Sequence, residues 1–402
     1  MPQFPTPALA AGTNCVTSGP PSNAYAVTPC ITGPADLATV SGLQTVSATY
    51  TTSGANPGVA KLYFYLNGEY LITDYSNPYT FSLTTNNWVD GSYVLAVAAL
   101  MKDGFTSQLS SITLTFNNGV TTPPVNTNTF TPTSGTTPAA GQPFVLAAAG
   151  DGADGATNAG NVTNQIASWN PNLFLYLGDV YEKGSATEFH NWYGTESTFY
   201  GRFRSITNPI IGNHEYEHGV APGYFDYWDN VANYYSYDAA GWHFIALNSN
   251  CGLRQDCAIG QTQYQWLLND LNTHTNACTI AYFHHPVYNV GPEGYTTTMN
   301  DMWALMAQYG VDIVLTGHDH DYQRWMPLDG SGNLSSTGIT QFVAGGGGHG
   351  IQQFITTDSR MAIGYDTSPY SFGALRLQLN QDGAGFQYMN SQGNLLDSGA
   401  IP

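Results

Sequence analysis

Two histidines stand two positions apart in the segment VLTGHDH, directly after a run of apolar residues. They are His318 and His320. Side chains two positions apart on an extended chain point to the same side, so both imidazoles can reach one site. Imidazole nitrogen is a common metal ligand in proteins. The segment therefore indicates a metal site at the end of a buried strand.

Four more polar clusters follow apolar runs in the second half of the chain. AAAGD ends at Asp151, YLGD ends at Asp179, GNHE contains Asn213 and His214, and YFHH contains His284. The carboxyl ends of strands in an α/β sheet face one crevice. We therefore expect these side chains to converge, although they lie far apart in the sequence.

The residue types indicate which ions such a site would hold. Carboxylate, amide oxygen and imidazole without cysteine suit Zn, Mn or Fe. Two Asp, one Asn and three His, without His214, make six ligand candidates, which exceed the needs of one open catalytic ion. Two ions about 3.5–4 Å apart that share a bridging carboxylate would use all six. Taken alone, a Gly-Asp after a strand usually forms a turn, and a single buried histidine usually has a structural role. The ordered set of five motifs favours a dinuclear centre.

The elements around these motifs predict an α/β domain over residues 143–402. Apolar runs there alternate with segments of helical periodicity. Strands that read as continuous apolar runs are buried on both faces, so helices must cover the sheets. We expect helices near 161–169 and 186–203, and over the segments TQYQWLLNDLNTH and NDMWALMAQYG.

The first third of the chain has a different pattern, so the protein is expected to be multidomain. Residues 35–117 contain β-rich segments separated by Asn-Gly and Asp-Gly turns, which predict an antiparallel β-sandwich of about seven strands. Residues 1–34 are expected to form a loop-like extension closed by a cysteine pair. The Thr/Pro-rich residues 118–142 predict an extended linker or a strap along the surface.

The five cysteines form two close pairs and one remainder. We expect disulfides between Cys15 and Cys30 and between Cys251 and Cys257, with Cys278 free beside an apolar strand. Disulfides persist in oxidising compartments, which favours an extracellular or cell-surface location. No apolar run approaches the ~20 residues needed to span a bilayer.

The charge of the chain excludes several kinds of partner. Nine Lys and Arg face 28 Asp and Glu, which gives a formal net charge of −19. The chain therefore lacks the clustered cations that nucleic acids and anionic membrane surfaces require. A small anionic substrate would also be repelled unless bound metal ions reverse the local field.

The five motifs resemble those of a known enzyme family. Asp151, the GD at 178–179, GNHE, AYFHHP and GHDHDYQR are similar to the motifs of the calcineurin-like metallophosphoesterases, in particular their purple-acid-phosphatase-like branch, over about residues 143–400. The strands FYLNG and DGSYVLAVAA resemble the immunoglobulin-like modules of bacterial secreted proteins. The first resemblance implies two mixed sheets packed face to face with helices outside, a four-layer αββα fold. It also implies hydrolysis of phosphate monoesters by metal-activated hydroxide.

The resemblance also implies roles for individual residues. His214 would hydrogen-bond the phosphoryl oxygens or the leaving group as the catalytic side chain, and Asn213 and His349 are further candidates for substrate binding. The implied metal ligands are Asp151, Tyr181 and His320 for the first ion, Asp179 as the bridge, and Asn213, His284 and His318 for the second ion.

The chain departs from the family pattern in three places. Purple acid phosphatases carry a tyrosine ligand three positions after the bridging aspartate, whereas here Tyr181 stands two positions after Asp179 and Glu182 stands third. We favour Tyr181. Asp154 in GDGADG is a rival to Asp151, which we prefer because it ends the apolar run. The family's substrate-facing histidines downstream of the fourth motif have no match in NVGPEGYTTTMND, so recognition of the leaving group is expected to differ.

Three further side chains have weaker cases. His285 follows His284 and is expected to point to the opposite sheet face in a structural role, because adjacent strand residues alternate. Arg324 in DYQR is expected to fix its loop through hydrogen bonds. Arg254 lies in the loop NCGLRQDCAIG and is a candidate contact for an anion.

Two alternatives stand beside a secreted phosphomonoesterase. A phosphodiesterase could use the same site, with room for a second ester arm. A surface protein could instead use the phosphatase fold as a scaffold, with the immunoglobulin-like module making cell-surface or self-assembly contacts. The complete six-ligand set argues against the scaffold, because an idle site has no physical need for all six side chains.

Overall fold

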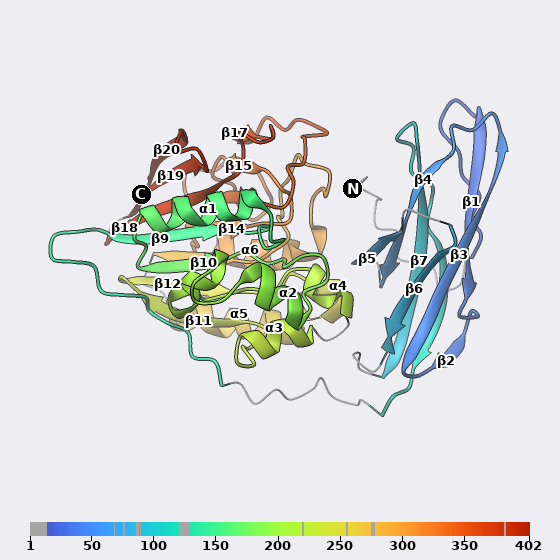
Figure 1. Cartoon of the computed structure of the whole chain (residues 1–402), viewed down its shortest axis with the longest axis horizontal. Helices are drawn as coiled ribbons and strands as arrows, with labels where there is room; N and C mark the ends of the chain where they lie inside the picture. Colours follow the sequence, from blue (N-terminus) through green and yellow to red (C-terminus); the bar gives the residue numbers. More distant parts are fainter. Residues whose placement is uncertain are drawn as a thin grey trace. The chain divides into compact units, whose positions relative to one another are not determined.

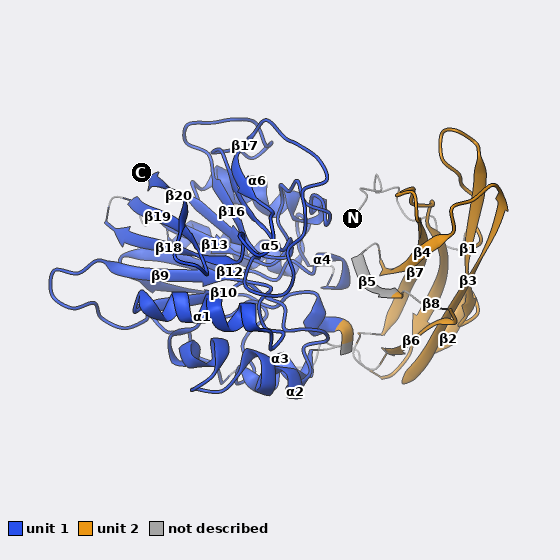
Figure 2. Ribbon diagram, turned by 45° about the horizontal axis from the view of Figure 1, so that its top comes forward, with its two compact units in different colours: residues 1, 127–216, 221–402 blue, residues 2–126, 217–220 orange. Residues whose placement is uncertain are grey.

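The computed structural model describes residues 14–67, 69–74, 77–85, 88, 90–119, 129–218, 221–254, 256–274, 278–381 and 383–402. The chain divides into two compact units, coloured orange and blue in Figure 2. The N-terminal unit contains residues 2–126 with 217–220, and the C-terminal unit contains residues 127–216 and 221–402. Across the described ranges, every helix is too short or too polar to cross a bilayer.

The N-terminal unit is a β-sandwich (Figure 1). One sheet has the strand order β1-β3-β6 and the other β2-β8-β7-β4-β5. Alternate residues of the strands point into the space between the sheets, where Val27, Phe64 and Leu95 are fully buried. The strands are β1 (Tyr25–Gly33), β2 (Ala38–Val40), β3 (Leu43–Gly54), β4 (Val59–Leu66), β5 (Glu69–Asp74), β6 (Tyr79–Thr84), β7 (Gly91–Met101) and β8 (Ser110–Phe116).

The sandwich begins earlier than residue 35, where the sequence placed its start. Strand β1 already pairs antiparallel with β3, with Val27 opposite Thr52. Its side chains alternate between buried and half-buried positions. The high Pro, Gly and Ser content around YAVTPCITG hid this alternation. Cys30 lies in β1 and forms the expected disulfide with Cys15.

The C-terminal unit contains two mixed sheets. The five-stranded sheet has the order β10-β9-β18-β19-β20, and the seven-stranded sheet has the order β11-β12-β13-β14-β16-β15-β17. The first is built from β9 (Phe144–Ala149), β10 (Leu173–Tyr176), β18 (Gly373–Asn380), β19 (Gly383–Asn390) and β20 (Leu395–Ile401). The second is built from β11 (Tyr235–Ala239), β12 (Trp242–Ala246), β13 (Thr279–Tyr282), β14 (Ile313–Thr316), β15 (Tyr322–Trp325), β16 (Thr340–Ala344) and β17 (Met361–Tyr365).

The two faces of the seven-stranded sheet bury different partners. Phe244 of β12 packs in one core with Leu377 of the other sheet. Its neighbour Ile245 points the other way, into a core that includes Leu267 and Trp303 of helices α5 (Thr262–Thr273) and α6 (Asn300–Gln308). Helix α1 (Thr157–Ser168) lies beside β18 of the five-stranded sheet (Figure 1). The unit therefore has the expected αββα layers.

The helix expected over 186–203 is broken into short pieces. These are α2 (Ala186–Glu188), a π-helical turn η2 (Phe189–Tyr193) and the 3₁₀ helix η3 (Phe199–Ile206). Gly194, which ends the second piece, has a φ of 102°, outside the helical range. The remaining helices are η4 (His214–His218), α3 (Pro222–Tyr227), α4 (Cys251–Arg254) and η5 (Thr297–Met299).

The second half of the Thr/Pro-rich segment is a strap along the C-terminal unit. The backbone N–H of Thr129 donates to the carbonyl of Asp229, and that of Thr136 to the carbonyl of Asn172. Asn208 accepts from the N–H of Thr133 at 2.9 Å. The expected linker residues 120–128 lie outside the described part of the chain.

Parallel pairing places the ends of several strands at one edge of each sheet. Strands β9 and β10 are parallel, and β12, β13, β14 and β16 form a parallel series in the other sheet. The loops that leave their carboxyl ends carry the polar motifs.

Candidate metal centre

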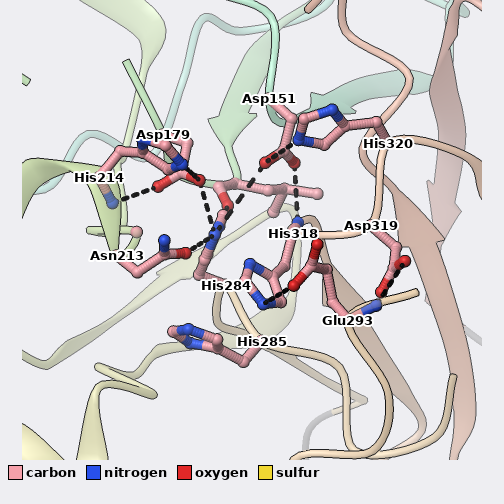
Figure 3. Close-up of polar contacts among 12 residues, drawn as sticks. Asp151, Asp179, Asn213, His214, His284, His285, Glu293, His318, Asp319 and His320 are labelled. Carbon is pink, nitrogen blue, oxygen red and sulfur yellow. Dashed lines mark hydrogen bonds and ion pairs between the residues drawn. The ribbon is translucent and has the colours of Figure 1, made fainter. Parts of the chain in front are cut away.

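Four of the predicted side chains meet just beyond the ends of four strands (Figure 3). Asp151 follows β9, Asp179 follows β10, His284 follows β13 and His318 follows β14. Nε2 of His284 lies 3.1 Å from Oδ2 of Asp179 and 4.0 Å from Oδ1 of Asp151. The backbone N–H of His318 donates to Oδ2 of Asp151 at 2.8 Å. All four side chains are buried.

Asn213 completes the side of the cluster around His284. Its Oδ1 lies 3.0 Å from Nε2 of His284. Nδ1 of His284 donates to the carbonyl oxygen of Leu177 at 2.7 Å, since a carbonyl can only accept. That bond fixes the ring so that Nε2 faces Asp179 and Asn213.

Tyr181 reaches the same cluster despite its shifted spacing. Its hydroxyl lies 3.0 Å from Oδ1 of Asp151, 3.2 Å from Oδ2 of Asp179 and 2.8 Å from Nε2 of His320. Glu182 points elsewhere, with a side chain that is 68% exposed. The structure therefore brings Tyr181 to the cluster, as favoured from the sequence.

Asp154 does not join the cluster. Its Oδ2 lies 3.0 Å from Nδ1 of His349. The imidazole of His349 stacks on the ring of Tyr181, with 3.7 Å between centroids and 13° between planes. His349 therefore borders the cluster, and Asp154 holds it there.

His214 lies at the rim of the cluster. Its backbone N–H donates to Oδ1 of Asp179 at 3.0 Å, and its Nδ1 lies 2.6 Å from the carbonyl oxygen of Glu182. Nε2 of His214 is 3.9 Å from Oδ2 of Asp179. The loops that carry the second and third motifs thus hold the ring beside the bridging candidate.

Three of these residues have an uncommon backbone conformation. The φ angles of Asp151, Asp179 and His318 are 60°, 65° and 72°. Non-glycine residues in this left-handed region cost on the order of 1–3 kcal/mol each and concentrate at functional sites. The conformation turns each chain sharply after its strand, so that the side chain faces the cluster.

The two aspartates are buried together, and ligand atoms of Asp151, Asp179 and His284 lie within 4.8 Å of one another. Burial raises the pKa of Asp151 well above its usual range. Burial also opposes the charge on Asp179, but His284 and His214 hold the pKa of its carboxyl well below its usual range. Two buried carboxylates this close together favour a cation between them.

The imidazoles complement the carboxylates. Burial, reinforced by His285, lowers the pKa of His318 well below its usual value, and burial, reinforced by His349, lowers that of His320 to about 3. Neutral imidazoles keep a lone pair for a metal ion. Burial opposes charge on His284, yet Asp179 and Asp151 raise its pKa to about 10, so this site attracts positive charge. The donor set therefore fits divalent or trivalent ions.

The expectation for His285 is wrong, because its ring lies beside the cluster. Strand β13 ends at Tyr282, so the alternation of strand side chains does not extend to this residue. The ring centroid of His285 is 4.3 Å from that of His318 and 4.9 Å from that of His284. Ligand atoms of these three histidines lie within 4.8 Å of one another.

Glu215 is a buried residue of the GNHE motif that the sequence interpretation missed. Its carboxylate accepts from the backbone N–H groups of Gly212 at 2.8 Å, Val180 at 2.6 Å and Asp179 at 3.2 Å. Burial and the neighbouring Asp179 raise the pKa of Glu215 to about 8. The side chain ties the second motif to the third.

The two arginines are engaged in ion pairs. Arg324 binds Asp397 through two nitrogens, at 2.7 and 3.1 Å, so it makes the expected hydrogen bonds, but from strand β15 rather than from a loop. Arg254 binds Asp256 at 2.9 Å beside the expected disulfide between Cys251 and Cys257. Cys278 is half-buried and outside both disulfides, as expected, and its Sγ lies 3.8 Å from the carbonyl oxygen of Gln381.

Family comparisons agree with this architecture. Residues 146–322 match the family described as Calcineurin-like phosphoesterase. Residues 28–97 match the family described as Bacterial Ig domain. The chain thus carries a metallophosphoesterase domain after an immunoglobulin-like module, and both recognitions are confirmed.

Several similar proteins are purple acid phosphatases. Purple acid phosphatase 15 of Arabidopsis thaliana is 26% identical over 207 residues, which cover 42% of this chain and 38% of that protein. Purple acid phosphatase 23 of the same plant is 39% identical over 97 residues, which cover 23% of this chain and 20% of that protein. The chain thus spans less than half the length of these relatives.

Two solved structures share the fold. A purple acid phosphatase from yellow lupin (Lupinus luteus) seeds superposes with a TM-score of 0.50 at 14% identity, covering 94% of this chain and 79% of that one. GAP50, the anchor in the inner membrane complex of Plasmodium, superposes with a TM-score of 0.50 at 12% identity, covering 64% and 88%. At these identities the likeness shows the fold alone.

Proposed function

We propose that this protein is a secreted dinuclear-metal phosphoesterase that hydrolyses phosphate monoesters. One observation carries the proposal: the tips of separate strands bring two carboxylates, an amide oxygen, a phenol and several imidazoles together in a buried cluster. Such oxygen and nitrogen donors without thiolate suit Fe, Zn or Mn. The similarity to purple acid phosphatases supports the same reaction.

Two ions would divide the donors between them. Asp179 lies between the two halves of the cluster, since its carboxylate is near both Tyr181 and His284. When bound, a pair of metal ions polarises the phosphoryl oxygens and lowers the pKa of water to near neutrality. The proposed ligands are Asp151, Tyr181 and His320 for the first ion, Asp179 for both, and Asn213, His284 and His318 for the second.

Three side chains around the centre would bind and orient the ester. His214 is anchored through Nδ1, and its Nε2, on the side of the bridging Asp179, would hydrogen-bond a phosphoryl oxygen or the leaving group. His349 is anchored by Asp154 on the other side of Tyr181. The amide of Asn213 would contribute a further contact. Their fixed positions would hold the ester in line for attack.

The location is proposed from the disulfides. Both pairs, Cys15 with Cys30 and Cys251 with Cys257, are formed. Such bonds persist outside the reducing cytosol, so we place the enzyme outside the cell or on its surface. The immunoglobulin-like module would then provide cell-surface or self-assembly contacts.

Metal analysis and two substrates test the proposal together. The full chain is analysed for bound metal and assayed with p-nitrophenyl phosphate and bis-p-nitrophenyl phosphate, with and without a chelator. We expect bound metal and chelator-sensitive hydrolysis that is faster with the monoester. Faster hydrolysis of the diester would make the protein a phosphodiesterase. A chain without metal or turnover would instead favour a scaffold.

A further inference from the structure

The carboxylate of Glu293 faces His318 (Figure 3). Oε2 of Glu293 lies 3.9 Å from Nε2 of His318, and the other nitrogen of that ring, Nδ1, is turned toward His284. Both side chains are largely buried, with 16% and 10% of their surface exposed. Glu293 comes from the segment NVGPEGYTTTMND, where the chain departs from the family pattern.

Oε2 of Glu293 is a buried atom that lacks a hydrogen-bond partner among the described residues. A buried carboxylate oxygen without a donor is costly, so its retention needs a reason. Nε2 of His318 is the ring nitrogen that faces it. A proton on that nitrogen would satisfy the oxygen and leave the lone pair of His318 on Nδ1.

The same loop that carries the proposed ligands holds Glu293 in place. Its backbone N–H donates to Oδ1 of Asp319 at 3.3 Å. Its Oε1 accepts from the side-chain amide of Gln352 at 3.1 Å, and Gln352 in turn accepts from the backbone N–H of His320 at 3.0 Å. The two residues that follow His318, Asp319 directly and His320 through Gln352, therefore hold the residue whose carboxylate faces His318.

We propose that Glu293 is a positioning residue for His318, on the basis of the metal centre proposed above. A histidine that binds a metal through one nitrogen donates the hydrogen on its other nitrogen, commonly to a carboxylate, which fixes the tautomer and the ring and makes the ligand more basic. Glu293 supplies that carboxylate. Oε2 of Glu293 and Nε2 of His318 are 3.9 Å apart, and in the metal-bound protein this carboxylate would accept the hydrogen on Nε2.

The test measures metal affinity rather than turnover. The full chain and its Glu293→Gln and Glu293→Ala variants are stripped of metal and titrated with Zn²⁺ against a chelator of known affinity. Both substitutions are expected to weaken binding at one of the two sites by about 10- to 100-fold. The near-isosteric Glu293→Gln variant should unfold at the same temperature as the wild type when both are metal-free. Glu182→Gln is the matched control, because its exposed carboxylate faces His349, and its affinity should be unchanged.

A spectrum of the bound ion separates positioning from packing. In the Co²⁺-loaded proteins, Glu293→Gln should change the visible absorption of one ion, whereas Glu182→Gln should not. If the wild type binds two ions and Glu293→Gln binds them as tightly with the same spectrum, the role of Glu293 is refuted and the metal centre stands. If the wild type binds no metal, both proposals are refuted.

Discussion

The hydroxyl of Tyr181 lies 2.8 Å from Nε2 of His320. The two residues are 139 positions apart in the chain. Tyr181 follows a strand of the five-stranded sheet, and His320 follows a strand of the seven-stranded sheet. This contact is the basis for proposing the phenol as a ligand of the first ion, although Tyr181 stands one residue nearer to Asp179 than the tyrosine of purple acid phosphatases does.

Substitution of Tyr181 tests this placement. Tyr181→Phe removes the oxygen but keeps the ring that stacks on His349. If the phenolate binds a ferric ion, the iron-loaded wild type shows a visible charge-transfer band and the variant loses it while still folding. Absorption spectra of iron-reconstituted protein decide the point. A band that persists in Tyr181→Phe would exclude the tyrosine as its source.

Asp179 is the proposed bridge, so its loss should affect both ions. Asp179→Asn replaces a charged oxygen pair with a neutral amide, which binds cations weakly. We expect fewer than two bound ions and a fall in kcat on the order of 10³-fold, because each polarising ion contributes several kcal/mol. Elemental analysis and turnover of p-nitrophenyl phosphate measure the two effects. Asp229→Asn, which changes an exposed partner of Arg204, should leave both unchanged.

A second histidine cluster lies at the opposite end of β12, and it predicts a pH-dependent stability. The ring of His243 is buried between two carboxylates. Its Nδ1 lies 2.8 Å from Oδ1 of Asp238, and its Nε2 lies 2.8 Å from Oδ2 of Asp270. The same ring stacks on the ring of His274. Burial opposes its charge, but hydrogen bonds to Asp270 and Asp238 raise its pKa above the usual value. Its stabilising effect is therefore complete below the unfolded pKa near 6.5 and is lost as the pH rises through the folded value.

Urea unfolding of the wild type and His243→Gln, with chelator present, measures this contribution. At pH 5.5 we expect the wild type to be more stable by about 1–3 kcal/mol, as for hydrogen bonds to charged groups. The difference should shrink toward alkaline pH. A difference that stays constant or grows with pH would contradict a charged His243.

We expect Glu215 to contribute both to the free energy of unfolding and to metal binding. Glu215→Ala leaves three buried backbone N–H groups without their acceptor, and each such loss costs about 1–3 kcal/mol. We expect a clear fall in the free energy of unfolding and weaker metal binding. Glu215→Gln, which keeps one acceptor oxygen, should lose less. Equal stability of Glu215→Ala and the wild type would show that water or another group replaces the carboxylate.

The sequence predicts those site residues that stand at the ends of apolar strands. The end of an apolar run marks the end of a buried strand, and parallel strands end at one edge of a sheet. This rule identified Asp151, Asp179, His284 and His318. The preference for Asp151 over Asp154 followed from the same rule. The layers of the fold were predictable for the same reason, since apolar runs alternate with helical segments.

The sequence does not predict side chains whose position depends on loops. His285 was misplaced because strand β13 ends before it, and strand alternation was applied one residue too far. Glu293 lies in a segment with no periodicity, and its place beside His318 depends on contacts with Asp319 and Gln352. The start of β1 was missed because its prolines and glycines hide the alternation of a strand. The breaks between 186 and 206 were missed because the helical pattern does not show where the backbone leaves the helix.

The number of metal ions needed for activity tests the central claim most directly. The metal-stripped chain is titrated with Fe²⁺, Mn²⁺ or Zn²⁺ in separate experiments while hydrolysis of p-nitrophenyl phosphate is recorded. A dinuclear centre predicts that activity reaches its maximum at two equivalents per chain. Full activity at one equivalent, or no activity at any ratio with any of the three metals Fe, Zn and Mn, would contradict it.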